Sequence, residues 1–157
     1  MADVVSPAVR SRMMAGIRSK NTRPELLIRR GLFALCYRYR LHVASLPGKP
    51  DLVFPGRRAV IFVHGCFWHR HNCALFKWPS TNAAFWRTKI LRNRLVDRRV
   101  FRKLERAEWR VLTIWECALK GAGRTEIDRV IGATARWLNS GSSSSEIRGR
   151  RARRAKR

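Results

Sequence analysis

The chain has 157 residues, a length typical of one domain that is large enough to bury a hydrophobic core. Its 35 Lys and Arg residues against 10 Asp and Glu residues give a formal net charge of +25, which predicts a polyanionic partner. No run approaches the ~18 consecutive apolar residues of a membrane-spanning helix, so we expect no membrane association and a cytoplasmic location.

The first elements expected along the chain are two helices. Ser6 and Pro7 have the residue types of a helix cap and a first helical position, and they predict a short N-terminal helix. A second helix is expected from Thr22 to about Cys36, because "TRPE" at residues 22–25 has the Ser/Thr-x-x-Glu capping pattern.

Three extended runs follow, separated by the turn signals "LPGKP" and "PGR", and they predict an antiparallel meander. These runs are "YRYRLHV", "DLVF" and "RAVIFV". A long helix over roughly 82–107, a fourth strand at 109–117 and a closing helix with a Thr125-x-x-Asp128 cap complete the order. The long helix is expected to connect strands three and four as a right-handed crossover between parallel neighbours.

This order predicts an α/β fold with a mixed four-stranded sheet flanked by helices. Parallel pairing would bring residues 63–66 near residues 115–117, at an edge where α/β proteins form their sites. After the last helix, residues 140–157 are rich in Ser, Gly and Arg and are expected to be a disordered tail that carries +6 of the +25. The remaining +19 makes residues 1–139 a basic folded domain.

Cysteine and histidine spacing predicts a structural metal site. Cys66, His71 and Cys73 lie close in sequence, and Cys117 is expected to arrive from the neighbouring strand end. Three cysteines and one histidine form a closed tetrahedral zinc site without an open position. The alternative is that the cysteines are ordinary buried thiols and His71 a surface residue. Cys36 is expected to be a core thiol of the second helix.

A second group carries catalytic chemistry. His64 and His69 lie outside the expected zinc shell, and histidine can accept or donate a proton near neutral pH. Asp51 begins a strand adjacent to the one that ends at His64, and a carboxylate there can hold Mg²⁺. Taken alone, either histidine could equally well be structural, and Asp51 would be a turn residue. Glu25 is explained by helix capping alone, and His42 is expected to lack a partner.

Three aromatic residues admit two interpretations. Phe67 and Trp68 lie in the loop with the expected zinc ligands, and Trp86 lies near the start of the long basic helix. They are either core residues or apolar wedges that unstack a DNA duplex.

The motifs "SLPGKPDLVF", "VIFVHGCFWHRHNC", "LRNRLVDRR" and "AEWRVLTIWEC", with Phe85 and Trp86, closely resemble the very-short-patch repair endonucleases over roughly residues 6–138. The resemblance implies a restriction-endonuclease-like core, Mg²⁺ dependence and a structural zinc. It implies nicking of one strand 5′ of the thymine in a T·G mismatch that arises from deamination of 5-methylcytosine. A monomer at the bacterial nucleoid is expected, with mismatch-repair proteins and a cytosine-5 methyltransferase as companions in the pathway.

The resemblance also assigns roles to individual residues. Asp51 and the Val63 carbonyl would hold magnesium, His69 would activate water or assist the phosphate, and His64 and Glu25 would support it. The zinc ligands it implies are the four named above. The DNA contacts it implies are the wedges Phe67, Trp68 and Trp86, the base-pair neighbours Lys89 and Asn93, and Met14 of a minor-groove helix.

The chain departs from the family pattern at three positions: Val63 stands for a usual Thr, Arg70 for a frequent His, and Glu108 for a common Gly. Two other functions stay open at this point. One is a zinc-stapled module that binds distorted duplexes without cutting them, which would leave Asp51, His64 and His69 idle. The other is a nuclease with a different lesion preference.

Overall fold

The structure is a computed structural model, and it describes residues 6, 8–9 and 20–151. The helices and strands follow one another as helix α2 (Arg23–Ala34), strands β1 (Arg40–Leu41), β2 (Leu52–Phe54) and β3 (Ala59–His64), helix α3 (Ala83–Arg106), strand β4 (Arg110–Trp115), helix α4 (Ile127–Ser140) and strand β5 (Ser145–Ile147). Two short 3-10 helices, η1 (Pro55–Arg57) and η2 (Glu116–Ala118), follow β2 and β4. The expected N-terminal helix, with Met14, falls almost entirely outside the described residues.

The sheet has five strands in the order β1-β2-β3-β4-β5. The first three pair antiparallel, as the meander predicted, and β3–β4 and β4–β5 pair parallel. The expected count of four strands was one too few, because residues 145–147 pair with residues 112–114 of β4. The expectation of a disordered tail from residue 140 is therefore wrong for this segment.

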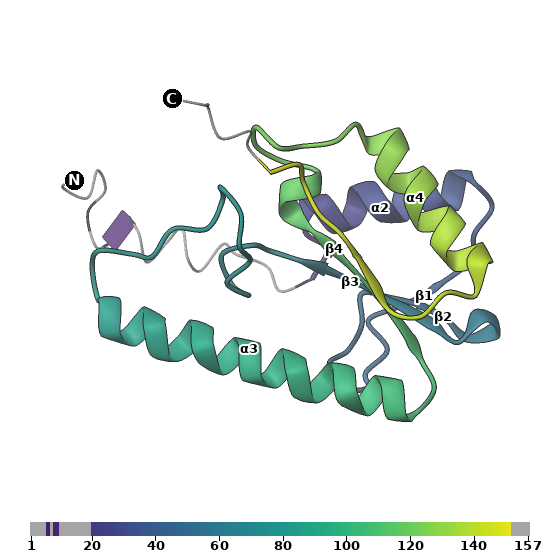
Figure 1. Ribbon diagram of the computed structural model, residues 1–157, viewed down its shortest axis with the longest axis horizontal. Helices are drawn as coiled ribbons and strands as arrows, with labels where there is room; N and C mark the ends of the chain where they lie inside the picture. Colours follow the sequence, from purple (N-terminus) through teal and green to yellow (C-terminus); the bar gives the residue numbers. More distant parts are fainter. Residues whose placement is uncertain (1–5, 7, 10–19, 152–157) are drawn as a thin grey trace.

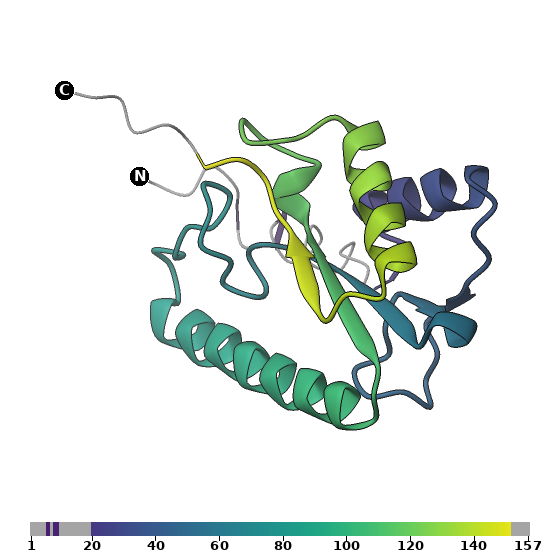
Figure 2. The same ribbon diagram turned by 45° about the vertical axis from the view of Figure 1, so that its right-hand side comes forward.

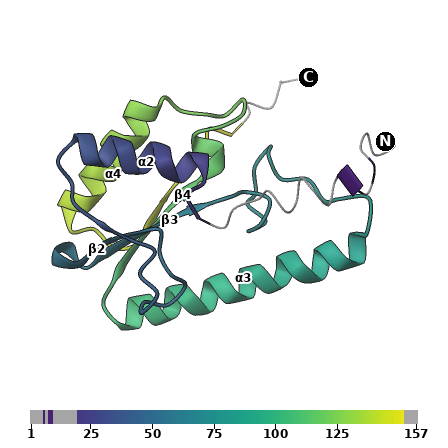
Figure 3. The ribbon, with the colours of Figure 1, turned by 180° about the vertical axis from the view of Figure 1, so that it is seen from behind.

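Three helices cover the sheet (Figure 1). The long helix α3 crosses one face, while α2 and α4 lie side by side on the other, an arrangement that is also visible from behind (Figure 3). Each face has its own hydrophobic cluster, so the central strand β3 is buried from both sides. This explains why β3 is apolar from Ala59 to Val63 instead of alternating.

The three sequence-predicted helix caps have different outcomes. The hydroxyl of Ser6 accepts a hydrogen bond from the Val9 amide at 3.3 Å, as expected of a cap. The hydroxyl of Thr22 accepts a hydrogen bond from the Glu25 amide at 3.4 Å, and the Asn21 amide donates to the Glu25 carboxylate at 2.8 Å. Thr22 therefore caps α2 as the motif predicted. The predicted cap at Thr125 is wrong, because α4 begins after Glu126, which makes no side-chain capping bond.

Parallel pairing of β3 and β4 positions the functional residues. The register places His64, the last residue of β3, opposite Trp115, the last residue of β4. Both strands therefore end at the same edge of the sheet, and the loop that follows β3 lies beside η2, which follows β4 (Figure 2). The predicted proximity of residues 63–66 and 115–117 is confirmed.

We expect Ile61→Ala to lower the free energy of unfolding by about 2–5 kcal/mol, because a fully buried side chain would be replaced by a cavity. Ile61 is 0% exposed and lies on β3 between Leu52 of β2 and Leu112 of β4. Urea unfolding measures the change. Leu95→Ala on α3, where Leu95 is 53% exposed, is the control and should change stability by less than about 0.5 kcal/mol. Equal effects of the two variants would contradict the assigned core.

Candidate metal and catalytic centre

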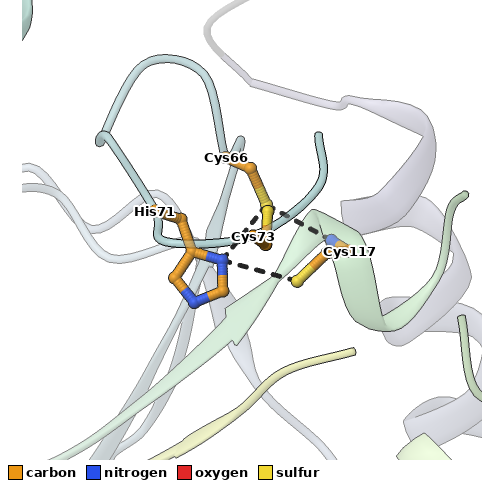
Figure 4. Close-up of side chains that lie close together, drawn as sticks. All are labelled: Cys66, His71, Cys73 and Cys117. Atoms are coloured by element: carbon orange, nitrogen blue, oxygen red, sulfur yellow. Dashed lines mark hydrogen bonds between the residues drawn. The ribbon is translucent and has the colours of Figure 1, made fainter. Parts of the chain in front are cut away.

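Four residues from two strand ends form a cluster that can hold a metal ion (Figure 4). Cys66, His71 and Cys73 come from the loop after β3, and Cys117 comes from η2 after β4. One ligand atom from each residue lies within 4.8 Å of all the others. The expectation that these four residues meet is therefore confirmed. The alternative that His71 is a surface residue is wrong, because His71 is buried.

The distances within this metal cluster fit tetrahedral coordination. The Nδ1 atom of His71 lies 3.6 Å from Sγ of Cys66 and 3.4 Å from Sγ of Cys117. A tetrahedral zinc ion with ordinary Zn–S and Zn–N bonds separates its nitrogen and sulfur ligands by about 3.5 Å. The donor set and its spacing therefore suit a metal such as zinc.

Burial changes the pKa values of the side chains in the metal cluster. It raises the pKa of the Cys66 and Cys117 thiols, and it lowers the pKa of His71, whose imidazole is then available in its neutral form. A metal must displace the thiol protons, so metal binding to these residues is coupled to proton release. Cys36, by contrast, is exposed and follows the end of α2, so the expectation of a core helix thiol is wrong.

A pair of stacked histidines lies next to the metal cluster. The rings of His64 and His69 are 3.8 Å apart and nearly parallel, with an interplanar angle of 2°. Burial, and secondarily the charge of His69, lowers the pKa of His64 well below its usual value, so His64 is neutral at neutral pH. The Nδ1 atom of His69 lies 2.5 Å from a carboxylate oxygen of Asp97 on α3.

Asp97 is the site residue that the sequence analysis missed. It occurs within the motif "LRNRLVDRR", where it is surrounded by arginines and looks like part of a solvated helix face. One signal could have identified it. Asp97 follows Asn93 by four residues, so both lie on the same face of α3. That face meets the loop after β3, because Asn93 donates a hydrogen bond to the Trp68 carbonyl at 3.1 Å.

Three further groups meet around the start of β2. The Asp51 carboxylate accepts a hydrogen bond of 2.7 Å from the Val63 amide, which ties it to the end of β3. The Nε2 atom of His42 lies 2.6 Å from the Glu25 carboxylate and 3.8 Å from that of Asp51. Glu25 is 1% exposed, and it contacts His42 in addition to its part in capping α2. The expectation that His42 lacks a partner is therefore wrong.

Burial raises the pKa of Asp51 to about 6, against the opposing effect of the Val63 hydrogen bond. Glu25 raises this pKa further by charge repulsion. The ionised form of Asp51 is disfavoured in this environment and would be stabilised by a bound cation, so the electrostatics around Asp51 favour a metal ion. Glu25, His42 and Asp51 offer ligand atoms within 4.8 Å of one another.

The expected wedge residues form an aromatic cluster beside the histidines. The ring centroids of Phe67 and Trp86 are 5.4 Å apart, and those of Trp68 and Trp86 are 5.8 Å apart. The ammonium of Lys89 lies 5.5 Å from the Trp68 ring. None of the three aromatics is fully buried, so they do not form a closed core. A cavity of about 770 Å³ joins Trp68 to Val63, His64 and His69.

The edge of the sheet thus combines a metal cluster, a stacked histidine pair, buried carboxylates and aromatic side chains. Carboxylates and histidines gathered at one edge of a strongly basic chain are the features expected of a DNA-acting hydrolase of the nuclease class.

Comparison with known proteins agrees with this class. The family model of the DNA mismatch endonuclease Vsr matches residues 2–75. DNA mismatch endonuclease Vsr of Escherichia coli is 41% identical over 147 residues, which is 94% of both chains. Type II nicking enzyme V.XorIIP of Xanthomonas oryzae is 47% identical over 80% of this chain and 93% of its own. Type II nicking enzyme V.NmeAIP of Neisseria meningitidis is 38% identical over 83% and 95%.

The chain therefore belongs to the Vsr family of DNA mismatch endonucleases. It is a Vsr-type endonuclease with a restriction-endonuclease-like α/β fold, as the motifs predicted, and DNA is its substrate. Within the described part of the chain, no helix is both long and apolar enough to cross a membrane.

We expect Asp51→Asn to stabilise the protein at pH 7.5 when no divalent cation is added. A folded-state pKa of about 6, above the usual value of 3.8, means that ionisation of Asp51 lowers stability as the pH rises from about 4 to about 6. The substituted amide cannot ionise and can still accept the Val63 hydrogen bond, so the variant should gain about 1–3 kcal/mol at pH 7.5. Urea unfolding at pH 4.5 and 7.5 measures this, and a gain that is equal at both pH values would contradict the shifted pKa.

Proposed function

We propose that this protein is a magnesium-dependent mismatch endonuclease that nicks one strand 5′ of the thymine in a T·G mismatch. The observation that carries the proposal is the hydrogen bond between Asp51 and Val63, the residue before His64, which holds a half-buried carboxylate at the strand end that carries the stacked pair His64 and His69. The relatives named as mismatch endonuclease and nicking enzymes support the reaction type. The T·G preference rests on the resemblance of the motifs.

Asp51 and the carbonyl of Val63 are the proposed magnesium ligands, with Glu25 and His42 behind Asp51. Carboxylate and carbonyl oxygens are the ligands that Mg²⁺ prefers. Burial and the nearby Glu25 raise the pKa of Asp51, and a cation bound there would favour its ionised form. A bound Mg²⁺ would stabilise the charge that develops on the scissile phosphate and would acidify a water molecule.

His69 is the proposed proton acceptor. If Nδ1 of His69 carries the proton that is shared with Asp97, Nε2 is left with a free lone pair and can take a proton from the attacking water. The buried and neutral His64 stacks on His69 and holds its ring in place. The third strand of this chain lacks the carboxylate-x-Lys pair of ordinary restriction nucleases. A histidine would therefore accept the proton of the attacking water.

The proposed role of the metal cluster is structural. Zinc bound by Cys66, His71, Cys73 and Cys117 would have no open position, so it would hold the loop after β3 instead of binding substrate. That loop carries His69 together with the proposed wedges Phe67 and Trp68, and zinc would fix both.

Phe67, Trp68 and Trp86 are proposed to insert beside the mismatch, with Lys89 and Asn93 near the base pair and Met14 in the minor groove. A wobble pair is weakly stacked, so it is cheaper to separate than a matched pair. The lesion would arise from deamination of 5-methylcytosine, which implies a cytosine-5 methyltransferase and mismatch-repair proteins in the same pathway. A monomer that acts at the bacterial nucleoid is proposed as well.

Nicking of a panel of duplexes tests the reaction and its specificity. With Mg²⁺, wild type should nick a T·G duplex on the thymine strand and should leave matched duplexes intact, and Asp51→Ala should bind the same duplex without nicking it. Binding without nicking under every divalent cation would favour the non-cleaving module. Faster nicking of another mismatch would favour a different lesion preference.

Asp97→Asn should lower kcat for T·G nicking by about 10²–10⁴-fold with little change in KM, because the amide would favour the wrong tautomer of His69. Glu105→Gln is the matched control, since Glu105 is an exposed acid on the same helix and should keep the wild-type rate. Single-turnover kinetics distinguish the two variants. A wild-type rate for Asp97→Asn would show that His69 does not depend on Asp97.

A further inference from the structure

We infer that residues 145–150, the C-terminal arm, form the outer wall of the metal cluster and position Trp115 against both the cluster and the histidine pair. The arm consists of β5 and the three residues that follow it. The Vsr family model ends at residue 75, so the arm lies outside that match. The inference rests on the proposal that the cluster binds zinc.

The first contact is made by the backbone of the arm. The Gly149 amide donates a hydrogen bond to Sγ of Cys117 at 3.3 Å. Hydrogen bonds from amides to a ligating sulfur stabilise its thiolate form and orient it toward the metal. The neighbouring residues hold the arm in place, because Arg148 donates to the Asn72 carbonyl at 2.6 Å and the Arg150 amide donates to the Gly123 carbonyl at 2.8 Å.

Only glycine fits at position 149. A Cβ atom there would lie 2.2 Å from the Cys117 carbonyl oxygen and 2.9 Å from the Gly123 carbonyl oxygen, and both of these are backbone atoms that cannot rotate away. The backbone of the arm therefore packs directly against the backbone of Cys117. Any side chain at position 149 would move the Gly149 amide away from the Cys117 sulfur.

The second contact runs through a side chain. The indole N–H of Trp115 donates to the Glu146 carboxylate at 2.9 Å. The Trp115 ring stacks on His71, with centroids 4.0 Å apart and an interplanar angle of 9°, and its edge faces His64 at 5.5 Å. Glu146 is thus a positioning residue that acts through Trp115 on one proposed zinc ligand and one proposed catalytic histidine.

These contacts connect the metal cluster with the stacked histidine pair. The arm binds Cys117 through the Gly149 amide and Trp115 through the Glu146 carboxylate, and the Trp115 ring contacts both His71 and His64. If β5 did no more than extend the sheet, its loss would lower stability without changing the coordination of the metal. A clamp on the cluster would change how tightly the metal is held.

Metal release measured with a chelating dye tests the inference on the full zinc-loaded protein. Gly149→Ala should bind zinc roughly 10- to 100-fold more weakly than wild type, the range that loss of an outer-shell partner produces, and should therefore release it faster. Gly56→Ala is the matched control, since nothing lies within 4 Å of a Cβ at position 56. Chains that end at residue 144 and at residue 151 form a second pair, and only the shorter chain should release zinc faster.

The Co²⁺-substituted protein supplies a readout that a purely structural role of the arm would not change. The thiolate-to-metal charge-transfer band should shift in Gly149→Ala and stay in place in Gly56→Ala. Glu146→Leu should also speed zinc release, whereas Glu146→Gln, which keeps an acceptor for the Trp115 indole, should not.

Wild-type zinc release and an unshifted band in Gly149→Ala and Glu146→Leu would overturn the inference, even if both variants unfold at a lower temperature. Failure of the proposed zinc site is a separate result, because wild type itself would then bind neither metal.

Discussion

Parallel pairing of β3 and β4 is the constraint on which the site depends. It places His64 and Trp115 in register at the ends of the two strands, so the segments that follow must meet. The loop after β3 contributes Cys66, His71 and Cys73, and η2 contributes Cys117. A crossover helix between parallel strands is thus what turns residues 51 positions apart in sequence into one metal cluster. The loop positioned in this way carries the proposed catalytic residue His69 and part of the aromatic cluster. The fold and the proposed chemistry therefore depend on the same strand pairing.

Burial gives the edge of the sheet its electrostatic character. Asp51 and His64 are both removed from water, and each is pushed toward its neutral form: the pKa of Asp51 rises to about 6 and that of His64 falls. A divalent cation bound at Asp51 would favour the ionised form of its carboxylate. His69 differs, because Asp97 lies against one of its ring nitrogens and defines its orientation. The neighbouring groups thus have distinct environments, as acid–base chemistry requires.

Residue spacing predicted most of the fold and the whole metal cluster, because alternation, capping and the crossover rule all act through local patterns or simple topology. The role of Asp97 was not predicted, because its contact with His69 depends on which face of α3 packs on the loop. The partner of His42 was not predicted either, because tertiary packing brings Glu25 to it. The C-terminal arm was mistaken for a disordered tail because it attaches through main-chain hydrogen bonds, a glycine and polar side chains, with Ile147 as its one apolar residue packed on the core. Composition detects segments that bury apolar side chains, and it is blind to segments that dock by their backbone.

The most direct test of this account combines elemental analysis with a count of reactive thiols in the native protein. Among the four cysteines, three lie in the metal cluster and Cys36 is exposed. The account predicts one zinc ion per chain and one rapidly reacting thiol, Cys36, with Cys66, Cys73 and Cys117 reacting only after a chelator removes the metal. A native protein without zinc, in which Cys73 and Cys117 react as fast as Cys36, would contradict it.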